Sequence, residues 1–324
     1  MSARTLVTGG AGYLGATLVA ELLDQGTAVR VLDSLSVGTG SSLLHLWGRE
    51  GFEFVAGDVR DETARRAALD GVDVVVHLAA VVGDPACARD PDSARAVNLD
   101  ATRALLGEAK AVGVGRFVFA STCSNYGRLA DGDAFATEDW DLSPVSLYAE
   151  TKVAGELDVL GSAGNGFSPT CLRFATVYGT SPRMRFDLTV NEFSRDALLT
   201  EKLVVYGEQF WRPYVHVRDA ARAIASVLSA RPEAVAGEVF NVGDTGQNFR
   251  KKDLVDLLVD RLPETRVEFV ARSEDPRDYR VSFEKIETRL GFAVSRTVPD
   301  GIDEVLGLLR SGAVADPFDA SYRN

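Results

Sequence analysis

A tyrosine and a lysine stand four residues apart, as Tyr148 and Lys152, in a stretch whose pattern predicts a helix over residues 147–160. Side chains at positions i and i+4 share one face of a helix, so the phenol and the ammonium are expected side by side. We expect the ammonium to lower the pKa of the phenol. A tyrosinate can take a proton from a hydroxyl while hydride leaves the same carbon. The spacing alone is weak evidence, because it also arises by chance in many helices.

Hydroxyl side chains follow a predicted strand at residues 115–120. There the chain continues Ser121-Thr122-Cys123-Ser124. A hydroxyl at the carboxyl end of a strand in an α/β fold points into the ligand crevice. Thr122 is therefore a candidate to hydrogen-bond the reacting oxygen and to share its proton with Tyr148.

Glycines recur at every third position, as Gly9, Gly12 and Gly15, between a predicted strand at 4–8 and a predicted helix that runs to about residue 25. The first permits a tight turn, the second lets backbone approach a pyrophosphate, and the third lets helix and strand pack closely. The helix start then offers free N–H groups to phosphates. In this strand–turn–helix context the spacing predicts a dinucleotide site.

Asp33 ends the second predicted strand, at 28–33, and lies 18 residues after Gly15. A carboxylate there accepts both adenosine ribose hydroxyls and repels a 2′-phosphate, which favours NAD over NADP. The alternative is that it only caps the next turn. Asp58, after a third strand at 52–56, can reach the adenine amine, whereas we expect His77 to be a buried structural histidine. Other candidates for cofactor contact lie near these strand ends: Tyr13, Leu14, Ser34, Val59, Leu78, Ala79 and Ala80.

Further apolar runs at 72–77 and 169–174, with a long helical pattern at about 92–112, continue the alternation of strand and helix. Continuous β-branched runs separated by helices predict a parallel sheet covered on both faces. The predicted fold is a doubly wound, Rossmann-like α/β domain over residues 1–175. A smaller substrate-binding lobe, partly interleaved with it, is predicted over 176–324, and its tail at 313–324 is expected to be loose.

The 324 residues are 46% hydrophobic and 25% charged, with a net charge of −12, so the chain has the composition of a globular protein. The acidity argues against a nucleic-acid partner. Three cysteines without a paired spacing indicate a reduced, cytoplasmic protein and no metal site. No apolar run is long enough to span a membrane.

The glycine turn, Asp33, the strand end at Thr122 and the Tyr148–Lys152 spacing together resemble the extended short-chain dehydrogenase/reductase superfamily. Within it the chain is most similar, to about residue 309, to NAD-dependent nucleotide-sugar epimerases and dehydratases. The resemblance implies that Thr122, Tyr148 and Lys152 are the catalytic set, that Lys152 also binds the nicotinamide ribose, and that Asn98 lies near the cofactor. It further implies a homodimer packed through the helix of Tyr148 and the helix from about residue 92.

The second lobe carries further matches to the same family. Arg212, in Arg-Pro-Tyr-Val-His-Val-Arg-Asp, and Arg272 are implied to bind the diphosphate of a sugar nucleotide, Asp275 its ribose, and Asn191 its nucleotide part. A planar guanidinium suits phosphate oxygens. The alternative is that these arginines are solvated surface charges. Two more arginines, Arg183 and Arg185, either face an acidic sugar or lie on the surface.

The strand end also discriminates between the reactions of this family. Sugar dehydratases and decarboxylases resemble one another in carrying acids after the catalytic threonine, and here Cys123 and Ser124 stand there. We interpret Cys123 as a packing residue and Ser124 as a substrate contact. This favours epimerisation at C4 of a nucleotide-diphosphate sugar, preferably a UDP-sugar, through a 4-keto intermediate with retained NAD. The alternatives are a nucleotide-sugar ketoreductase or dehydrogenase that uses NAD(P)H, then a decarboxylase or dehydratase, and a non-catalytic NAD-binding protein.

Overall fold

The computed structural model describes residues 3–38, 40–129, 134–271 and 277–324. Its centre is a seven-stranded sheet in the order β11-β7-β5-β4-β1-β2-β3, in which every neighbouring pair is parallel. This confirms the predicted doubly wound sheet. The strands are β1 (Arg4–Thr8), β2 (Ala28–Asp33), β3 (Phe52–Ala56), β4 (Val74–His77), β5 (Arg116–Thr122), β7 (Ser168–Phe174) and β11 (Glu238–Val242).

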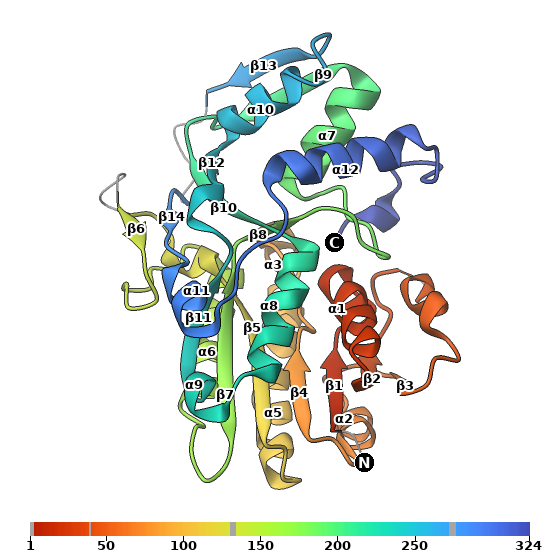
Figure 1. The fold of residues 1–324 in the computed structure, drawn as a ribbon, viewed down its shortest axis with the longest axis vertical. Helices are drawn as coiled ribbons and strands as arrows, with labels where there is room; N and C mark the ends of the chain where they lie inside the picture. Colours follow the sequence, from red (N-terminus) through yellow and green to blue (C-terminus); the bar gives the residue numbers. More distant parts are fainter. Residues whose placement is uncertain (1–2, 39, 130–133, 272–276) are drawn as a thin grey trace.

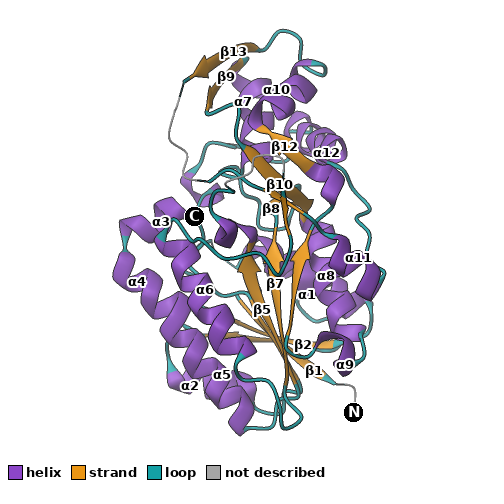
Figure 2. Ribbon diagram, turned by 90° about the vertical axis from the view of Figure 1, so that its left-hand side faces the viewer, coloured by secondary structure: helices purple, strands orange, loops and turns teal. Residues whose placement is uncertain are grey.

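Helices cover both faces of this sheet (Figure 2). One face carries α1 (Tyr13–Asp24), α8 (Val217–Ser229), α9 (Pro232–Val235) and α11 (Glu284–Leu290). The other carries α2 (Glu62–Leu69), α3 (Asp84–Arg89), α4 (Pro91–Arg95), α5 (Ala101–Ala111) and α6 (Leu147–Leu160). Two apolar clusters fill the layers between sheet and helices, as expected for strands buried on both sides.

The long helix predicted from about residue 92 is interrupted in the structure. A π-helical segment, Ala96–Asp100, joins α4 to α5. Such a widened turn shifts the side chains within it and is frequent at functional sites. Asn98 lies in this segment and is buried, so the interruption changes which face of the helix presents its amide.

The later part of the chain builds a second layer beyond the carboxyl ends of the strands (Figure 1). There β10 (Trp211–His216) lies between β8 (Thr176–Tyr178) and β12 (Asn248–Arg250), while β9 (Lys202–Tyr206) pairs with β13 (Arg266–Val270). Helices α7 (Thr189–Thr200), α10 (Lys251–Val259) and α12 (Val298–Arg310) pack on these strands, and a short pair joins β6 (Phe135–Ala136) to β14 (Arg280–Val281). The strand β11, which the sequence analysis did not predict, returns to the edge of the main sheet.

The expectation of a loose tail at 313–324 is wrong. The Tyr322 ring packs edge-on against Phe186 at 5.5 Å, and the Phe186 N–H donates to the Tyr322 carbonyl at 2.9 Å. The Arg195 guanidinium lies 4.5 Å from the Phe318 ring. The tail lacks helical periodicity but carries aromatic residues, and these find an apolar surface that only the folded second lobe provides.

Among the described residues, no helix combines the length and the apolar character that crossing a membrane requires.

Candidate active site

The glycine turn lies where β1 and β4 end and α1 begins (Figure 1). Gly9 has φ +71°, and a Cβ there would stand 2.7 Å from the backbone nitrogen of Ala79. A Cβ on Gly15 would stand 2.2 Å from the Gly9 carbonyl oxygen. Any side chain at these positions would therefore separate the turn from the strand and the helix. No side chain caps the start of α1 at Gly12, so its N–H groups face the open turn and fit a diphosphate.

Asp33 holds this turn together. One carboxylate oxygen accepts from the Ala11 N–H at 2.9 Å and the other from the Leu35 N–H at 2.8 Å. The structure thus shows that Asp33 caps the turn that follows it, as the alternative interpretation predicted. An ionised carboxylate has about four acceptor positions, so two remain for ribose hydroxyls. Ser34 next to it bonds Ser36.

Asp58 and Val59 follow β3 in the predicted place. The Asp58 carboxylate pairs with the Arg60 guanidinium at 2.7 Å, and the hydrogen bond from Arg60 lowers the pKa of Asp58. Val59 is buried. Asp58 is therefore ionised and partly exposed at the rim of the predicted adenosine site, and an adenine amine there would share it with Arg60.

His77 is a structural residue, as predicted. Its two ring nitrogens lie 2.7 Å from the Thr8 hydroxyl and 2.9 Å from the Thr102 hydroxyl. Burial lowers the pKa of His77 to about 3, so the ring is neutral at pH 7. The Thr8 hydroxyl also accepts from the Ala79 N–H at 3.2 Å, which fixes the backbone of residues 78–80 beside the glycine turn.

The helix α6 brings Tyr148 and Lys152 together as their spacing predicts. Tyr148 is half-buried and Lys152 is buried. The Lys152 ammonium lies 6.0 Å from the centre of the Tyr148 ring, 4.7 Å from that of Phe119, and donates to the Ala120 carbonyl at 2.9 Å. Burial lowers the pKa of Lys152 to about 8, so the group is close to titration near neutral pH.

The expected lowering of the Tyr148 pKa is wrong for the chain by itself. Burial raises the pKa of Tyr148, the neighbouring Cys87 and Asp84 add to that rise, and Arg185 opposes it. The ammonium of Lys152, 6.0 Å from the ring centre and bonded to the Ala120 carbonyl, does not offset the loss of hydration. The side chains alone therefore favour the neutral phenol.

The end of β5 places Thr122 and Ser124 as a short capped turn. The Thr122 hydroxyl accepts from the Ser124 N–H at 3.1 Å, and the Ser124 hydroxyl lies 3.3 Å from the Tyr279 hydroxyl. Cys123 is buried, and its thiol donates to the Arg173 carbonyl at 3.1 Å. Burial raises the pKa of Cys123 well above its usual value, so the thiol stays protonated. The interpretation of Cys123 as a packing residue is confirmed.

A buried ion pair beneath this turn was not found in the sequence. Glu156 and Arg173 are almost fully buried and form a multiply hydrogen-bonded pair. Burial opposes the charge of Arg173, but the hydrogen bond and the charge of Glu156 outweigh it and raise the pKa of Arg173. The Glu156 carboxylate also accepts from the Ser121 hydroxyl at 2.8 Å, and Arg173 donates to the Tyr126 hydroxyl at 2.9 Å. The pair thus links α6, which carries Tyr148 and Lys152, to β5 and β7.

Asn98 is positioned by the π-helical segment. Its amide oxygen accepts from the Val81 N–H at 2.7 Å, and its amide nitrogen donates to the Val81 carbonyl at 3.0 Å. The same nitrogen lies 3.3 Å from the Thr151 hydroxyl, next to Lys152. Asn98 therefore connects the loop after β4 to α6, the helix of Tyr148 and Lys152.

On the side of the second lobe, Arg212 is buried and donates to the carbonyls of Trp211 at 2.6 Å and Arg277 at 2.7 Å. Its guanidinium lies 5.4 Å from the centre of the Tyr279 ring. Arg212 is therefore not a solvated surface charge. Arg272 and Asp275, the other predicted ligands of this lobe, lie outside the described residues.

Three residues that were not among the predicted site residues connect the two parts of the chain. The Arg277 guanidinium pairs with the Asp84 carboxylate at 2.9 Å, and that carboxylate accepts from the Ser146 hydroxyl at 2.7 Å. Ser146 caps the start of α6. The three residues are far apart in the chain and belong to no local pattern, so no sequence signal could have joined them.

Asn191 is buried, and its amide is engaged by the protein itself. Its oxygen accepts from the Gly179 N–H at 2.9 Å, and its nitrogen donates to the Arg185 carbonyl at 2.9 Å and lies 3.2 Å from the Tyr13 hydroxyl. The structure thus uses Asn191 to shape the loop 179–187. Arg183 in this loop is buried too, and Arg185 is buried and pairs with Asp187.

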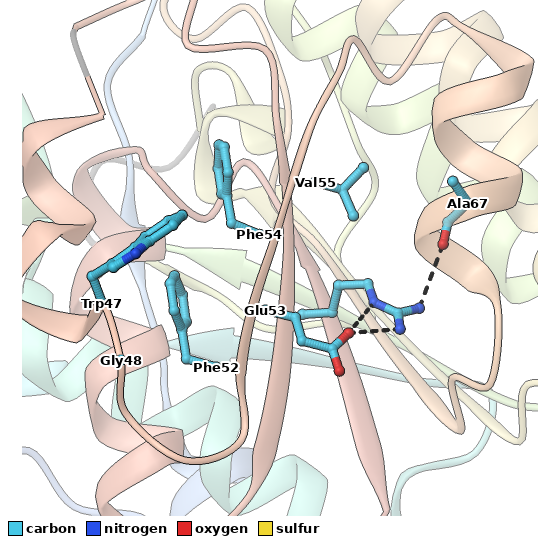
Figure 3. Close-up of a pocket in the computed structure, with 8 residues that line it drawn as sticks. Trp47, Gly48, Phe52, Glu53, Phe54, Val55 and Ala67 are labelled. Carbon is cyan, nitrogen blue, oxygen red and sulfur yellow. Dashed lines mark hydrogen bonds and ion pairs between the residues drawn. The ribbon is translucent and has the colours of Figure 1, made fainter.

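A hollow of about 500 Å³ lies elsewhere, at the outer strand β3 (Figure 3). Its lining consists of Arg30, Trp47, Gly48, Phe52, Glu53, Phe54, Val55 and Ala67. None of the predicted site residues is among them. Arg30 pairs there with Glu53 at 2.6 Å, so the hollow presents no unpaired charge from this arginine and is separate from the catalytic set.

Known proteins are similar to this chain in both sequence and fold. A dTDP-glucose 4,6-dehydratase of Streptomyces griseus is 33% identical over 312 residues, which cover 93% of this chain and 92% of the relative. A UDP-glucose 4-epimerase of Corynebacterium glutamicum is 28% identical, covering 91% and 92%. The dTDP-glucose 4,6-dehydratase DesIV of Streptomyces venezuelae, solved with NAD and TYD bound, superposes with a TM-score of 0.85 at 30% identity, covering 96% of this chain and 98% of that one.

A family model supports the same assignment over most of the chain. The model described as "NAD dependent epimerase/dehydratase family" matches residues 5–243, which include the glycine turn, Asp33, the end of β5 and the Tyr148–Lys152 pair. The relatives are named for different nucleotide sugars and different reactions, so membership of the family does not fix one activity. The chain belongs to the NAD-dependent epimerase/dehydratase family.

Proposed function

We propose that this protein epimerises a nucleotide-diphosphate sugar at C4, through a 4-keto intermediate and with NAD retained between turnovers. The observation that carries the proposal is the end of β5. There the position after the buried Cys123 holds Ser124, a hydroxyl bonded to Tyr279. Elimination of water or loss of carbon dioxide would require further proton transfer, whereas oxidation and re-reduction of one carbon need only the Thr122, Tyr148 and Lys152 set.

The residues fit the bound cofactor. The glycine turn and the uncapped start of α1 would hold its diphosphate, Asp33 and Asp58 its adenosine half, and Lys152 its nicotinamide ribose. Bound NAD would supply the hydride acceptor and, in its oxidised form, a positive ring that favours the tyrosinate.

Tyr148 is the proposed base for the C4 hydroxyl, and Thr122 the residue that orients the reacting oxygen. The raised pKa of Tyr148 in the chain alone means that the phenol stays protonated until a cation lies beside it. Proton removal is thereby confined to the enzyme that holds oxidised cofactor. Lys152 holds its proton less firmly than a free lysine, so its charge is lost above about pH 8.

On the substrate, Arg212 is the proposed diphosphate ligand and Ser124 a sugar ligand. A UDP-sugar is proposed because a UDP-glucose 4-epimerase is among the relatives. A second candidate is 4,6-dehydration of a dTDP-sugar. The observation that favours it is the relationship to dTDP-glucose 4,6-dehydratases at 33% and 30% identity.

We also propose a homodimer packed through α5 and α6. The ion pair of Arg103 with Asp158, at 2.6 Å, joins the exposed sides of the two helices, and the neighbouring Leu157 is 64% exposed. Leu157→Glu should convert a dimer to a monomer in light scattering. A wild-type protein that is monomeric at high concentration would contradict the proposal.

The test of activity uses purified protein with a panel of UDP-, dTDP-, GDP- and CDP-sugars and no added cofactor, analysed by chromatography and mass spectrometry. A product of unchanged mass establishes an epimerase and identifies the sugar. Loss of 18 mass units, the mass of water, establishes the dehydratase instead. Turnover that starts only after NADH or NADPH is added establishes a ketoreductase.

A further inference from the structure

The loop Gly179–Asp187 belongs to the second lobe and contacts the start of α1. The Tyr13 hydroxyl donates to the Gly179 carbonyl at 2.5 Å, and the Ser181 hydroxyl donates to the Tyr13 carbonyl at 2.6 Å. Tyr13 is the first residue of α1. The loop is therefore fixed against the same helix start that faces the cofactor phosphates.

Arg183 stands in this loop as a buried cation, with only 8% of its surface exposed. One of its nitrogens donates to the Arg323 carbonyl at 2.9 Å. In the part of the chain that the structure describes, no carboxylate lies within ion-pair distance of it. A guanidinium has five N–H donors, so most of its capacity is unused. Burying a charge in this state is costly unless a ligand completes it.

Arg185, two residues further on, shows the contrasting case. Its guanidinium forms two parallel hydrogen bonds with the Asp187 carboxylate, at 2.8 and 2.7 Å. The charge of Arg185 is thereby neutralised within the loop. Burial lowers the pKa of Arg183, the charge of Arg185 lowers it further, and the carboxylates of Asp187 and Asp33 act in the opposite direction. Arg183 is therefore within electrostatic reach of Asp33, at the predicted adenosine end of the cofactor site.

The glycine turn and the helix that follows it carry no cationic side chain of their own. No lysine or arginine occurs in residues 5–29, which form β1 after its first residue Arg4, the turn, α1 and the start of β2, and the chain carries a net charge of −12. Backbone N–H groups and a helix start stabilise a diphosphate, but they carry no full positive charge. A planar guanidinium can bind two phosphate oxygens at once.

We propose that Arg183 binds the diphosphate of NAD, so that the substrate lobe supplies the cation that the dinucleotide-binding turn lacks. The carboxyl-terminal residues hold it there. Besides the bond from Arg183 to Arg323, the Asn324 N–H donates to Asp187 at 3.2 Å, and the Phe186 N–H donates to Tyr322. The end of the chain is thus a positioning segment for the loop over the cofactor.

The test compares ligands with and without a diphosphate on protein freed of co-purified nucleotide. Titration calorimetry of Arg183→Gln should show affinity for NAD and ADP-ribose reduced about 10- to 100-fold, as for loss of a charge-assisted hydrogen-bonded pair, and unchanged affinity for adenosine. Arg183→Lys should lose less, because the charge remains. Arg310→Ala, an exposed arginine of α12, is the matched control and should bind all three ligands like the wild type.

Two results would overturn the proposal. Equal losses for adenosine and ADP-ribose would show that Arg183 only supports the loop. Unchanged NAD affinity with weakened sugar-nucleotide binding would assign it to the substrate. If Arg183→Gln does not fold, the same ligands are compared on Arg183→Lys and on a chain that ends at residue 319. Each of these variants should bind ADP-ribose more weakly than the wild type and adenosine equally well. These binding results are independent of which sugar reaction the enzyme performs.

Discussion

The floor and the roof of the site are built in different ways. The floor, formed by the end of β5 and by α6, takes its reactive groups from residues that are near one another in the chain, such as Tyr148 and Lys152. The roof, formed by the loop 179–187 and the tail, depends on partners more than a hundred residues away: Gly179 bonds Tyr13, and Arg183 bonds Arg323. The arrangement of the floor can therefore be predicted from local sequence periodicity, whereas the roof forms only through long-range packing.

The two regions also differ in their buried charges, although the roof too contains one closed pair, Arg185 with Asp187. In the floor, Glu156 and Arg173 neutralise each other, and hydroxyl groups satisfy their remaining bonds. In the roof, Arg183 has a backbone carbonyl and no carboxylate among the described residues. Removing one partner of a closed buried pair is strongly destabilising, whereas a buried cation without a carboxylate can complete its hydrogen bonds with a ligand. The comparison assigns scaffolding to the floor network and ligand binding to the roof.

The largest effect is expected from removing the floor's reactive hydroxyl. Tyr148→Phe should lower turnover by about 10²- to 10⁴-fold, as for loss of a general base. Co-purified NAD should be retained, because the phenol is not part of the glycine turn. Turnover is measured by chromatography and retained NAD by absorbance after extraction. Activity close to that of the wild type would show that another group removes the proton.

The floor pair should carry the largest single contribution to stability. Glu156→Gln leaves Arg173 buried without its carboxylate and should lower the free energy of unfolding by about 3–5 kcal/mol. Urea denaturation measures it. Glu62→Gln removes the exposed partner of Arg66 and is the matched control, with an expected cost of under about 1 kcal/mol. Similar costs for both variants would contradict the scaffold role.

The roof should show an acid-sensitive contact at Glu304. Burial alone would raise the pKa of Glu304, but hydrogen bonds from His216 and Thr180 outweigh it and lower the pKa from 4.5 to about 2. Its contribution of roughly 3 kcal/mol is therefore present above pH 4.5 and is lost as the pH falls toward 2.

Glu304→Gln should consequently destabilise the protein at pH 7 and narrow its difference from the wild type in acid. Chemical denaturation at a series of pH values measures this difference. If the difference in the free energy of unfolding between the two proteins stays constant down to pH 3, the carboxylate acts through its shape and not through its charge.

The smallest effect is expected where the roof meets α1. Tyr13→Phe removes the hydroxyl that donates to Gly179 and should cost about 1 kcal/mol, the usual net value of one hydrogen bond. Tyr126→Phe, in the floor, is the variant for comparison. The Tyr126 hydroxyl bonds both Arg173 and Asn241, so Tyr126→Phe should lower the free energy of unfolding by more than Tyr13→Phe does.

Much of the floor was predictable from sequence for a physical reason. The strands are short β-branched runs, and the glycines stand at positions where the turn tolerates no Cβ. The i, i+4 spacing of Tyr148 and Lys152 survives because helix geometry is local. The same local logic failed for the Tyr148 pKa, since burial depends on the whole fold and not on the nearest charge.

The sequence by itself predicted six of the seven strands of the main sheet, the glycine turn and the pairing of Tyr148 with Lys152, because each depends on periodicity or on spacing within one element. The tertiary structure alone decided the link of Arg277 to Asp84, the docking of the tail and the burial of Arg183. Those features join segments whose separation in the chain carries no pattern. Their partners meet only because the second lobe folds back over the ends of the strands, and this places one buried cation beside the cofactor turn.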